Sequence, residues 1–310
     1  MSSKIRFLIL LLPLICCSCN YGWYIFLFGE ESVESRADSL PLIEDVCPEV
    51  LPQFSTLPQT YSFMLITDPH IGAQIYDVHK DEFLELFTKL LGETEDEGKK
   101  PRFVISLGDN GDGGRAHEFR ELNEMFDTMA KMAKEKGVVE KASDFKNLSV
   151  LGNHDLYNDG WENFKEIEEP FASLKKKGFL SSAYTFTDGT FTFYVLDSGS
   201  GTLGETQREI VKNAMENDSK PKIVLTHVPI YAGGNFLMTM QDTRERNILL
   251  TLFEKNNVKS LFCGHAHKEY GYNYGSWKEQ VFDAFGQHRR AYLVTVDRKN
   301  ESVSWTRFEF

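Results

Sequence analysis

Residues 103–110 read Phe-Val-Ile-Ser-Leu-Gly-Asp-Asn, an apolar run of strand length that stops at a glycine followed by a carboxylate. Such continuous apolar runs are typical of strands buried on both faces. We therefore predict a buried strand that carries Asp109 to the edge of a sheet. Four other segments share this design, an apolar run that ends in residues of metal-ligand type: 66–70 (Ile-Thr-Asp-Pro-His), 151–155 (Leu-Gly-Asn-His-Asp), 225–227 (Leu-Thr-His) and 263–267 (Cys-Gly-His-Ala-His).

Around these segments, strand-like runs alternate with stretches in which apolar residues recur at helical spacing, as in 83–91 and 119–133. Strands separated by helices pair in parallel within a buried sheet. Residues 183–194 show two alternating runs around Asp-Gly, which is typical of a hairpin, and further strand-like runs close the chain between 280 and 310. The pattern predicts an α/β domain over residues 61–310, with two mixed sheets face to face and helices outside.

Composition limits the class of protein. The 310 residues, 41% of them hydrophobic, fit one globular domain with an N-terminal appendage. The formal net charge of -12 argues against a broad grip on nucleic acid, because such a grip needs a basic face. Outside the N-terminal apolar run the only cysteines are Cys47 and Cys263, so there is no disulfide framework. A bridge between the two is an alternative to the ordinary buried thiol expected at the end of a strand.

Residues 1–28 have the composition of a signal peptide or membrane anchor, because Lys4 and Arg6 precede a long apolar run. The charge bias places the N-terminus in the cytoplasm and the body of the protein outside, either secreted or membrane-anchored. Three outcomes stay open. The segment is cleaved, or it is retained as an anchor because residues 24–28 extend the apolar run toward the roughly 20 residues of a bilayer span. In the third, it is lipidated at Cys19, since residues 16–19 loosely resemble a bacterial lipoprotein processing box.

Residues 29–60 are acidic, contain four prolines and show no sustained period. We expect an acidic linker, some of whose late residues pack on the domain.

Histidines gather at the predicted strand ends. Five of the eight histidines lie there, beside aspartates and an asparagine. A single histidine is more often a hydrogen-bonded core residue than a ligand, but five at strand ends make that interpretation poor. In open α/β sheets, ligands bind at the carboxyl ends of strands. Oxygen and imidazole ligands without thiolate suit Mn, Fe, Zn or Co better than a structural zinc site, and so many ligands imply two metal ions.

Five motifs carry a specific resemblance. They are, in chain order, Asp68-x-His70, Gly108-Asp109-x-x-Asp112, Gly152-Asn153-His154-Asp155, His227 and Gly264-His265-x-His267. In this order, each after a predicted strand, they resemble the motifs of the calcineurin-like metallophosphoesterases over about residues 61–270. The resemblance implies a four-layer α/β/β/α sandwich of two mixed sheets, with a dinuclear centre of divalent or trivalent metals at the strand carboxyl ends.

Site roles follow from motif position in the resemblance. By this transfer one metal would be bound by Asp68, His70 and His267, and the other by Asn153, His227 and His265. Asp109 would bridge the two metals, which offsets the repulsion between them. A metal-bridging hydroxide would attack phosphorus while His154 protonates the leaving oxygen and Asp112 orients His154. For Asp155, a loop-capping role is as good an interpretation as a catalytic one.

The implied activity is hydrolysis of a small phosphomonoester or phosphodiester, and the sequence does not separate the two. No Asp-Arg-Gly follows the bridging motif, and no tyrosine stands three residues after Asp109. These departures weaken the resemblance to protein serine/threonine phosphatases and to purple acid phosphatases, respectively. The alternative is a non-catalytic, metal-stabilised surface binding protein on the same fold. Oligomeric state has no signal in the sequence.

Overall fold

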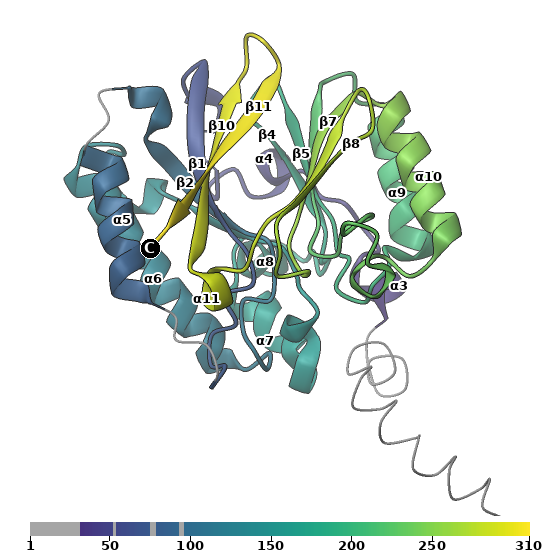
Figure 1. Ribbon diagram of the computed structural model, residues 1–310, viewed down its shortest axis with the longest axis horizontal. Coiled ribbons are helices and arrows are strands. Elements are labelled where there is room, and N and C mark those ends of the chain that lie inside the picture. Colours follow the sequence, from purple (N-terminus) through teal and green to yellow (C-terminus); the bar gives the residue numbers. More distant parts are fainter. Residues whose placement is uncertain (1–31, 52–53, 75–78, 93–95) are drawn as a thin grey trace, which may run out of the picture.

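The computed structural model describes residues 32–51, 54–74, 79–92 and 96–310. Two sheets lie face to face in the middle of the molecule, and helices cover their outer faces (Figure 1). The predicted four-layer α/β/β/α sandwich of two mixed sheets is therefore confirmed. The predicted export segment, 1–28, lies outside the described residues. Among the described helices, none has the length and apolar character needed to cross a bilayer.

The first sheet has the strand order β11-β10-β1-β2-β3. Three consecutive strands are parallel, and the last of them is at the edge of the sheet: β1 (Thr60–Ile66), β2 (Pro101–Ser106) and β3 (Asn147–Ser149). The C-terminal strands β10 (Arg290–Asp297) and β11 (Ser302–Glu309) extend it in antiparallel fashion. Helices α5 (Lys80–Gly92) and α6 (Ala116–Glu135) pack on its outer face (Figure 1).

The second sheet has the order β4-β5-β6-β7-β9-β8. Four strands are parallel: β5 (Thr192–Val195), β6 (Lys222–Leu225), β7 (Val258–Cys263) and β9 (Lys278–Val281). The edge strands β4 (Tyr184–Thr187) and β8 (Tyr270–Asn273) are antiparallel to their neighbours. The predicted hairpin is β4–β5. Helices α9 (Gly204–Glu216) and α10 (Thr243–Lys255) cover the outer face. After β1 the described chain also has three shorter helices, α7 (Gly160–Ile167), α8 (Phe171–Lys176) and α11 (Phe285–His288).

Side-chain alternation along the strands builds the layers. On β1, Phe63 and Leu65 enter the core between the sheets, whereas Met64 and Ile66 face α5 and α6. Successive side chains of a strand point to opposite faces, so both faces of the sheet are buried. This explains why the central strands read as continuous apolar runs in the sequence.

The segment before β1 differs from the expected linker. Helices α3 (Val33–Arg36) and α4 (Ile43–Val46) pack on the domain, and Ile43 and Cys47 are fully buried in the core between the sheets. Its buried apolar residues are irregularly spaced, so no helical or strand period marks them. Acidic and proline content alone therefore predicted a linker where the chain packs closely. Cys47 and Cys263 are both free and buried, and no bridge joins them.

Candidate metal centre

The loops that follow five strands meet at one end of the two sheets. Loops after β1, β2 and β3 come from the first sheet, and loops after β6 and β7 come from the second. The structure brings the predicted ligands together there, in groups whose ligand atoms lie within 4.8 Å of one another. The groups are Asp68, His70, Asp109 and His267; His70, Asp112 and His154; and Asp109, His227 and His265.

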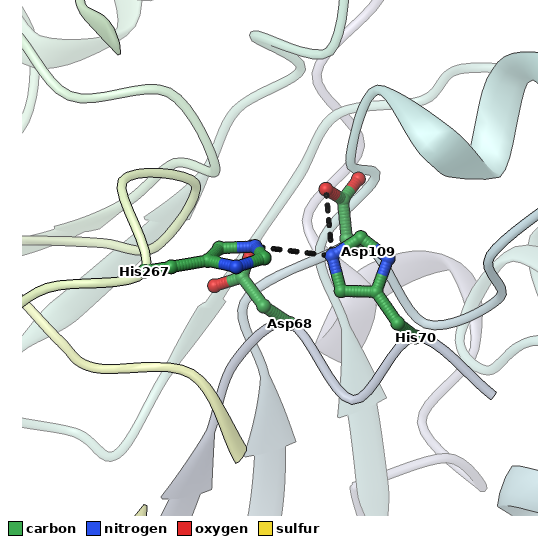
Figure 2. Close-up of side chains that lie close together, drawn as sticks. All are labelled: Asp68, His70, Asp109 and His267. Carbon is green, nitrogen blue, oxygen red and sulfur yellow. Dashed lines mark hydrogen bonds and ion pairs between the residues drawn. The ribbon is translucent and has the colours of Figure 1, made fainter. Parts of the chain in front are cut away.

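The first group contains two carboxylates and two imidazoles (Figure 2). His267 Nε2 lies 3.2 Å from Asp68 Oδ1 and 3.0 Å from His70 Nε2. His70 Nε2 in turn lies 3.6 Å from Asp109 Oδ2. Four donor atoms from three loops therefore converge on one small volume.

The group of Asp109, His227 and His265 shares Asp109 with the first group. His227 Nε2 lies 3.2 Å from Asp109 Oδ2 and 3.0 Å from Asn153 Oδ1. Asn153 is buried, and its Nδ2 has no hydrogen-bond partner among the described residues. The shared position of Asp109 is where a bridging ligand would stand. Carboxylate oxygens, an amide oxygen and imidazole nitrogens form the donor set, so the residues fit two metal ions of the predicted kinds.

The backbone at these ligands is unusual. Ten non-glycine residues of the described chain have positive φ, and five of them are predicted ligands. They are Asp68 (φ 51), His70 (φ 47), Asp109 (φ 52), His265 (φ 67) and His267 (φ 47). This left-handed conformation costs on the order of 1–3 kcal/mol for each residue, and such residues cluster at functional sites. The strain supports the interpretation of these loops as a functional site.

Two motif glycines permit the close approach of the loops. Gly108 has φ 96, and a Cβ atom there would lie 2.7 Å from His227 Nδ1. At Gly264 a Cβ atom would lie 1.8 Å from Thr67 Oγ1. Any side chain at either position would force the two sheets' loops apart, because real contacts of a Cβ are longer than 3.0 Å.

His154 and Asp112 lie beside the first group. The backbone N–H of His154 donates to Asp109 Oδ1 at 2.7 Å, and its Nδ1 lies 2.7 Å from the carbonyl oxygen of Asp112. The Asp112 carboxylate lies 3.2 Å from His70 Nδ1 and 3.6 Å from His154 Nδ1. A carbonyl can only accept, so the contact places a hydrogen on His154 Nδ1. The ring therefore has a fixed orientation next to the ligands.

The family model for calcineurin-like phosphoesterases matches residues 61–269, which include every predicted site residue. The chain belongs to the calcineurin-like phosphoesterase family. No match is found among curated protein sequences.

Several solved structures have a fold similar to that of this calcineurin-like phosphoesterase. A dimetal phosphatase from Danio rerio is 12% identical, with 76% of this chain and 95% of that chain covered and a TM-score of 0.50. GAP50, described as the anchor in the inner membrane complex of Plasmodium, is 14% identical, with 81% and 89% covered and a TM-score of 0.52. Purple acid phosphatase PPD1 from yellow lupin seeds is 13% identical, with 82% and 55% covered and a TM-score of 0.50. At these identities the similarity shows the fold alone.

Opposite charges shift the pKa values in the phosphoesterase site. Burial alone would lower the pKa of His227, but Asp109 and Asp68 raise it to about 9. The pKa of His267 is likewise raised to about 9, against burial, by Asp68. Burial opposes ionisation of the two carboxylates, yet the neighbouring histidines lower the pKa values of Asp68 and Asp109. Without metal, His227 and His267 therefore each carry an additional proton at neutral pH.

Two other histidines of the phosphoesterase site have low pKa values. Burial lowers the pKa of His265 to about 3 and that of His154 to about 4. A buried imidazole loses the hydration that stabilises its charged form. His265 is therefore neutral at neutral pH, the form in which histidine binds metal.

Two groups that hold ligand rings in the candidate site had no signal in the sequence, Gln287 and the carbonyl of Leu107. Gln287 Oε1 lies 2.8 Å from His267 Nδ1, and the carbonyl oxygen of Leu107 lies 2.8 Å from His227 Nδ1. These contacts fix which ring nitrogen faces the site.

Asp155 accepts hydrogen bonds from Gly152 N (2.8 Å), Gly111 N (3.0 Å) and Asn110 Nδ2 (3.0 Å). It therefore has the loop-capping role and ties the loops of Asp109 and Asn153 together.

Proposed function

We propose that this protein is an exported, metal-dependent hydrolase that uses two metal ions to cleave a small phosphomonoester or phosphodiester. One observation carries the proposal: residues of every ligand type required by two metals converge from five loops, and a histidine that is not needed as a ligand stands beside them. Membership of the phosphoesterase family supports the same reaction class.

Each metal would have its own ligands. The first would be held by Asp68, His70 and His267, and the second by Asn153, His227 and His265, with Asp109 common to both. When bound, the metals supply Lewis-acid stabilisation of the phosphate oxygens and activation of the attacking water. The chain itself supplies the orientation, because Gln287 and the Leu107 carbonyl hold the rings of His267 and His227 in place.

His154 would donate a proton to the leaving oxygen. Its Nδ1 hydrogen is held by the Asp112 carbonyl, so Nε2 is the atom that would carry the transferred proton. Burial lowers the pKa of His154 to about 4, whereas a general acid works best with a pKa near the working pH. The negative charge of a bound phosphate ester would raise that pKa, because a nearby opposite charge favours the charged imidazole.

The decisive experiment measures metal content and turnover together. We expect the full chain to bind about two metals and to hydrolyse p-nitrophenyl phosphate or bis-(p-nitrophenyl) phosphate, with activity lost on chelation and restored by metal. The ratio of the two rates separates monoesterase from diesterase. The variant His79→Gln is a matched control, since His79 pairs with Glu82 outside the site. Two bound metals with no turnover of either ester would instead support the non-catalytic binding protein.

Export is a separate part of the proposal. The composition of residues 1–28 supports it, and cleavage, lipidation and retention remain the three forms it could take. Mass spectrometry of the N-terminus, together with cell fractionation, distinguishes them. An intact Met1 on protein found in the cytoplasm would refute export.

A further inference from the structure

A buried charge ties the N-terminal segment to the domain. Arg36, at the end of α3, is 2% exposed, although it lies 25 residues before the part of the chain that matches the family. Its Nε donates to Asp197 Oδ2 at 3.0 Å, and its Nη2 donates to Ser200 Oγ at 3.0 Å. Such a pair is weak evidence for stability, because the desolvation of two charges offsets their attraction. The position of the pair suggests a different role.

Asp197 organises the loop that follows β5, residues 197–200. Its Oδ1 accepts from Gly199 N at 2.9 Å, and its Oδ2 also accepts from Ser182 Oγ at 2.6 Å. Its backbone N–H donates to Gln207 Oε1 at 2.9 Å, and its carbonyl oxygen accepts from Gln207 Nε2 at 2.8 Å. Arg36 is therefore the cation that compensates the buried carboxylate at the centre of this loop.

The same loop contacts two ligand-bearing segments. Ser198 Oγ accepts hydrogen bonds from the backbone N–H groups of His227 at 3.1 Å and Val228 at 2.8 Å. A Cβ atom on Gly199 would lie 2.9 Å from the carbonyl oxygen of Gly152, so the loop also packs against the residue before Asn153. Loop 197–200 thus supports the backbone of both His227 and Asn153, which share one metal in the proposed assignment.

We propose that Arg36 is a positioning residue of the metal centre. Through Asp197 it holds loop 197–200 in the conformation that places His227 and Asn153, so the N-terminal segment is a working part of the phosphoesterase site. The inference rests on the proposed function for the assignment of ligands to the two metals. It explains why a guanidinium is buried at a point remote from every motif.

The two metal sites should respond differently to loss of Arg36. The first site has supports of its own, because His265 N donates to Asp68 and Gln287 contacts His267. The second also has the Leu107 carbonyl on His227, but among the two sites it is the one whose backbone is held by Ser198 of loop 197–200. Loss of a residue that orients ligands typically costs 10–100-fold in metal affinity. We therefore expect Arg36→Met to weaken one metal by about 10- to 100-fold and to leave the other nearly unchanged.

The test titrates the full-length, metal-free protein with Mn²⁺ and measures bound metal by equilibrium dialysis. Arg36→Met removes the charge and keeps a similar side-chain length. Arg36→Lys keeps the charge but cannot donate to Asp197 and Ser200 in the geometry of a guanidinium, so we expect it to recover part of the affinity for the second metal. Arg36→Met combined with Asp197→Asn removes both charges and avoids an unpaired buried anion. It should fold better than Arg36→Met but keep the weakened second metal, since the tie to the loop is still missing.

Ile43→Ala is the matched control. Ile43 is fully buried in the same N-terminal segment, so the change loosens that segment without touching loop 197–200. Two full-affinity metals in Ile43→Ala and one in Arg36→Met would support the inference. Equal weakening of both metals in Arg36→Met, the same metal loss in Ile43→Ala, or unchanged binding in the double variant would overturn it. A wild-type protein that binds fewer than two metals would overturn the proposed function and, with it, this inference.

Discussion

Asp109 and His227 contact each other across the two sheets, with Asp109 Oδ2 3.2 Å from His227 Nε2. One follows β2 in the first sheet, and the other follows β6 in the second. Asp109 also belongs to both groups of ligands around His70 and His265. No other residue in the described chain is common to these two groups, so its loss should affect both metals.

Asp109→Asn should therefore lose metal at both sites. The amide keeps the shape of the carboxylate but not its charge, and two cations would be left less shielded from each other. His70→Ala, in contrast, should mainly weaken one metal. Metal analysis after dialysis gives the comparison. A stoichiometry near two per chain in Asp109→Asn would be incompatible with a bridging role.

His154→Ala should keep its metals, because the neighbouring Asn153 and the remaining ligands are intact. General acid catalysis contributes typically 10²–10⁴-fold, and most where the leaving group is a strong base. We expect a loss in that range on an alkyl phosphate ester and a much smaller loss on the nitrophenyl ester. The measurement is kcat/KM for both esters alongside metal content. Equal losses on both, with metal retained, would show that His154 positions the substrate and does not donate the proton.

Metal binding to the metal-free protein at pH 7 should release protons. The raised pKa values of His227 and His267, both about 9, mean that each ring carries an additional proton at pH 7. Each proton must leave before the ring binds metal. Affinity should therefore rise by up to about tenfold per pH unit for each metal as the pH increases, and level off above about pH 9. Proton release in weak buffer measures this directly, and an affinity that does not change between pH 6 and 9 would contradict it.

Ile43→Ala should destabilise the fold, because Ile43 is fully buried in the core between the sheets. A buried isoleucine replaced by alanine typically loses about 2–5 kcal/mol of unfolding free energy. Asp45→Ala in the same helix is the control, since Asp45 is exposed and such changes stay within about 0.5 kcal/mol. Urea unfolding compares the two. Equal urea midpoints for the two variants would mean that packing of the segment before β1 does not contribute to the unfolding free energy of the domain.

Glu168 should make stability fall as the pH rises. Burial, with smaller contributions from Asp155 and Glu169, raises the pKa of Glu168 to about 8 against the lowering effect of the hydrogen bond from Ser149. The unfolded chain releases this proton near pH 4.3, so between about pH 4 and 8 the folded state holds more protons and loses stability with increasing pH. The slope is on the order of 1 kcal/mol per pH unit. Glu168→Gln should remove this pH dependence. The unfolding free energy of the variant relative to that of the wild type, measured by urea unfolding, should therefore be more favourable at pH 8 than at pH 5. An equal difference at the two pH values would argue against a raised pKa of Glu168.

The convergence of the candidate ligands could be predicted because each of them stands directly after an apolar run. A strand buried on both faces leaves a strong local signal, and a glycine before the ligand marks its end, as at Gly108 and Gly264. The Asp188-Gly189 turn likewise predicted the β4–β5 hairpin from local chemistry alone. These features are all set within a few residues of the chain.

Other features depend on contacts that no short stretch reveals. Arg36 and Asp197 are 161 positions apart, and neither lies in a motif. The strand β8 has mostly exposed side chains and lacks the apolar run that marks the central strands. The helices of the N-terminal segment, α3 and α4, have four residues each, too few to show a period. In each case tertiary packing, and not local propensity, decides the structure.

The origin of the ligands in two sheets has a mechanical consequence. The sheets meet largely through apolar side chains, and apolar attraction has no preferred direction, so it only weakly opposes a small sliding of one layer on the other. Coordination bonds are directional and short. A pair of metals held by loops of both sheets would link the two layers, and the distance between the metals would then depend on the register between two whole sheets and not on any single loop.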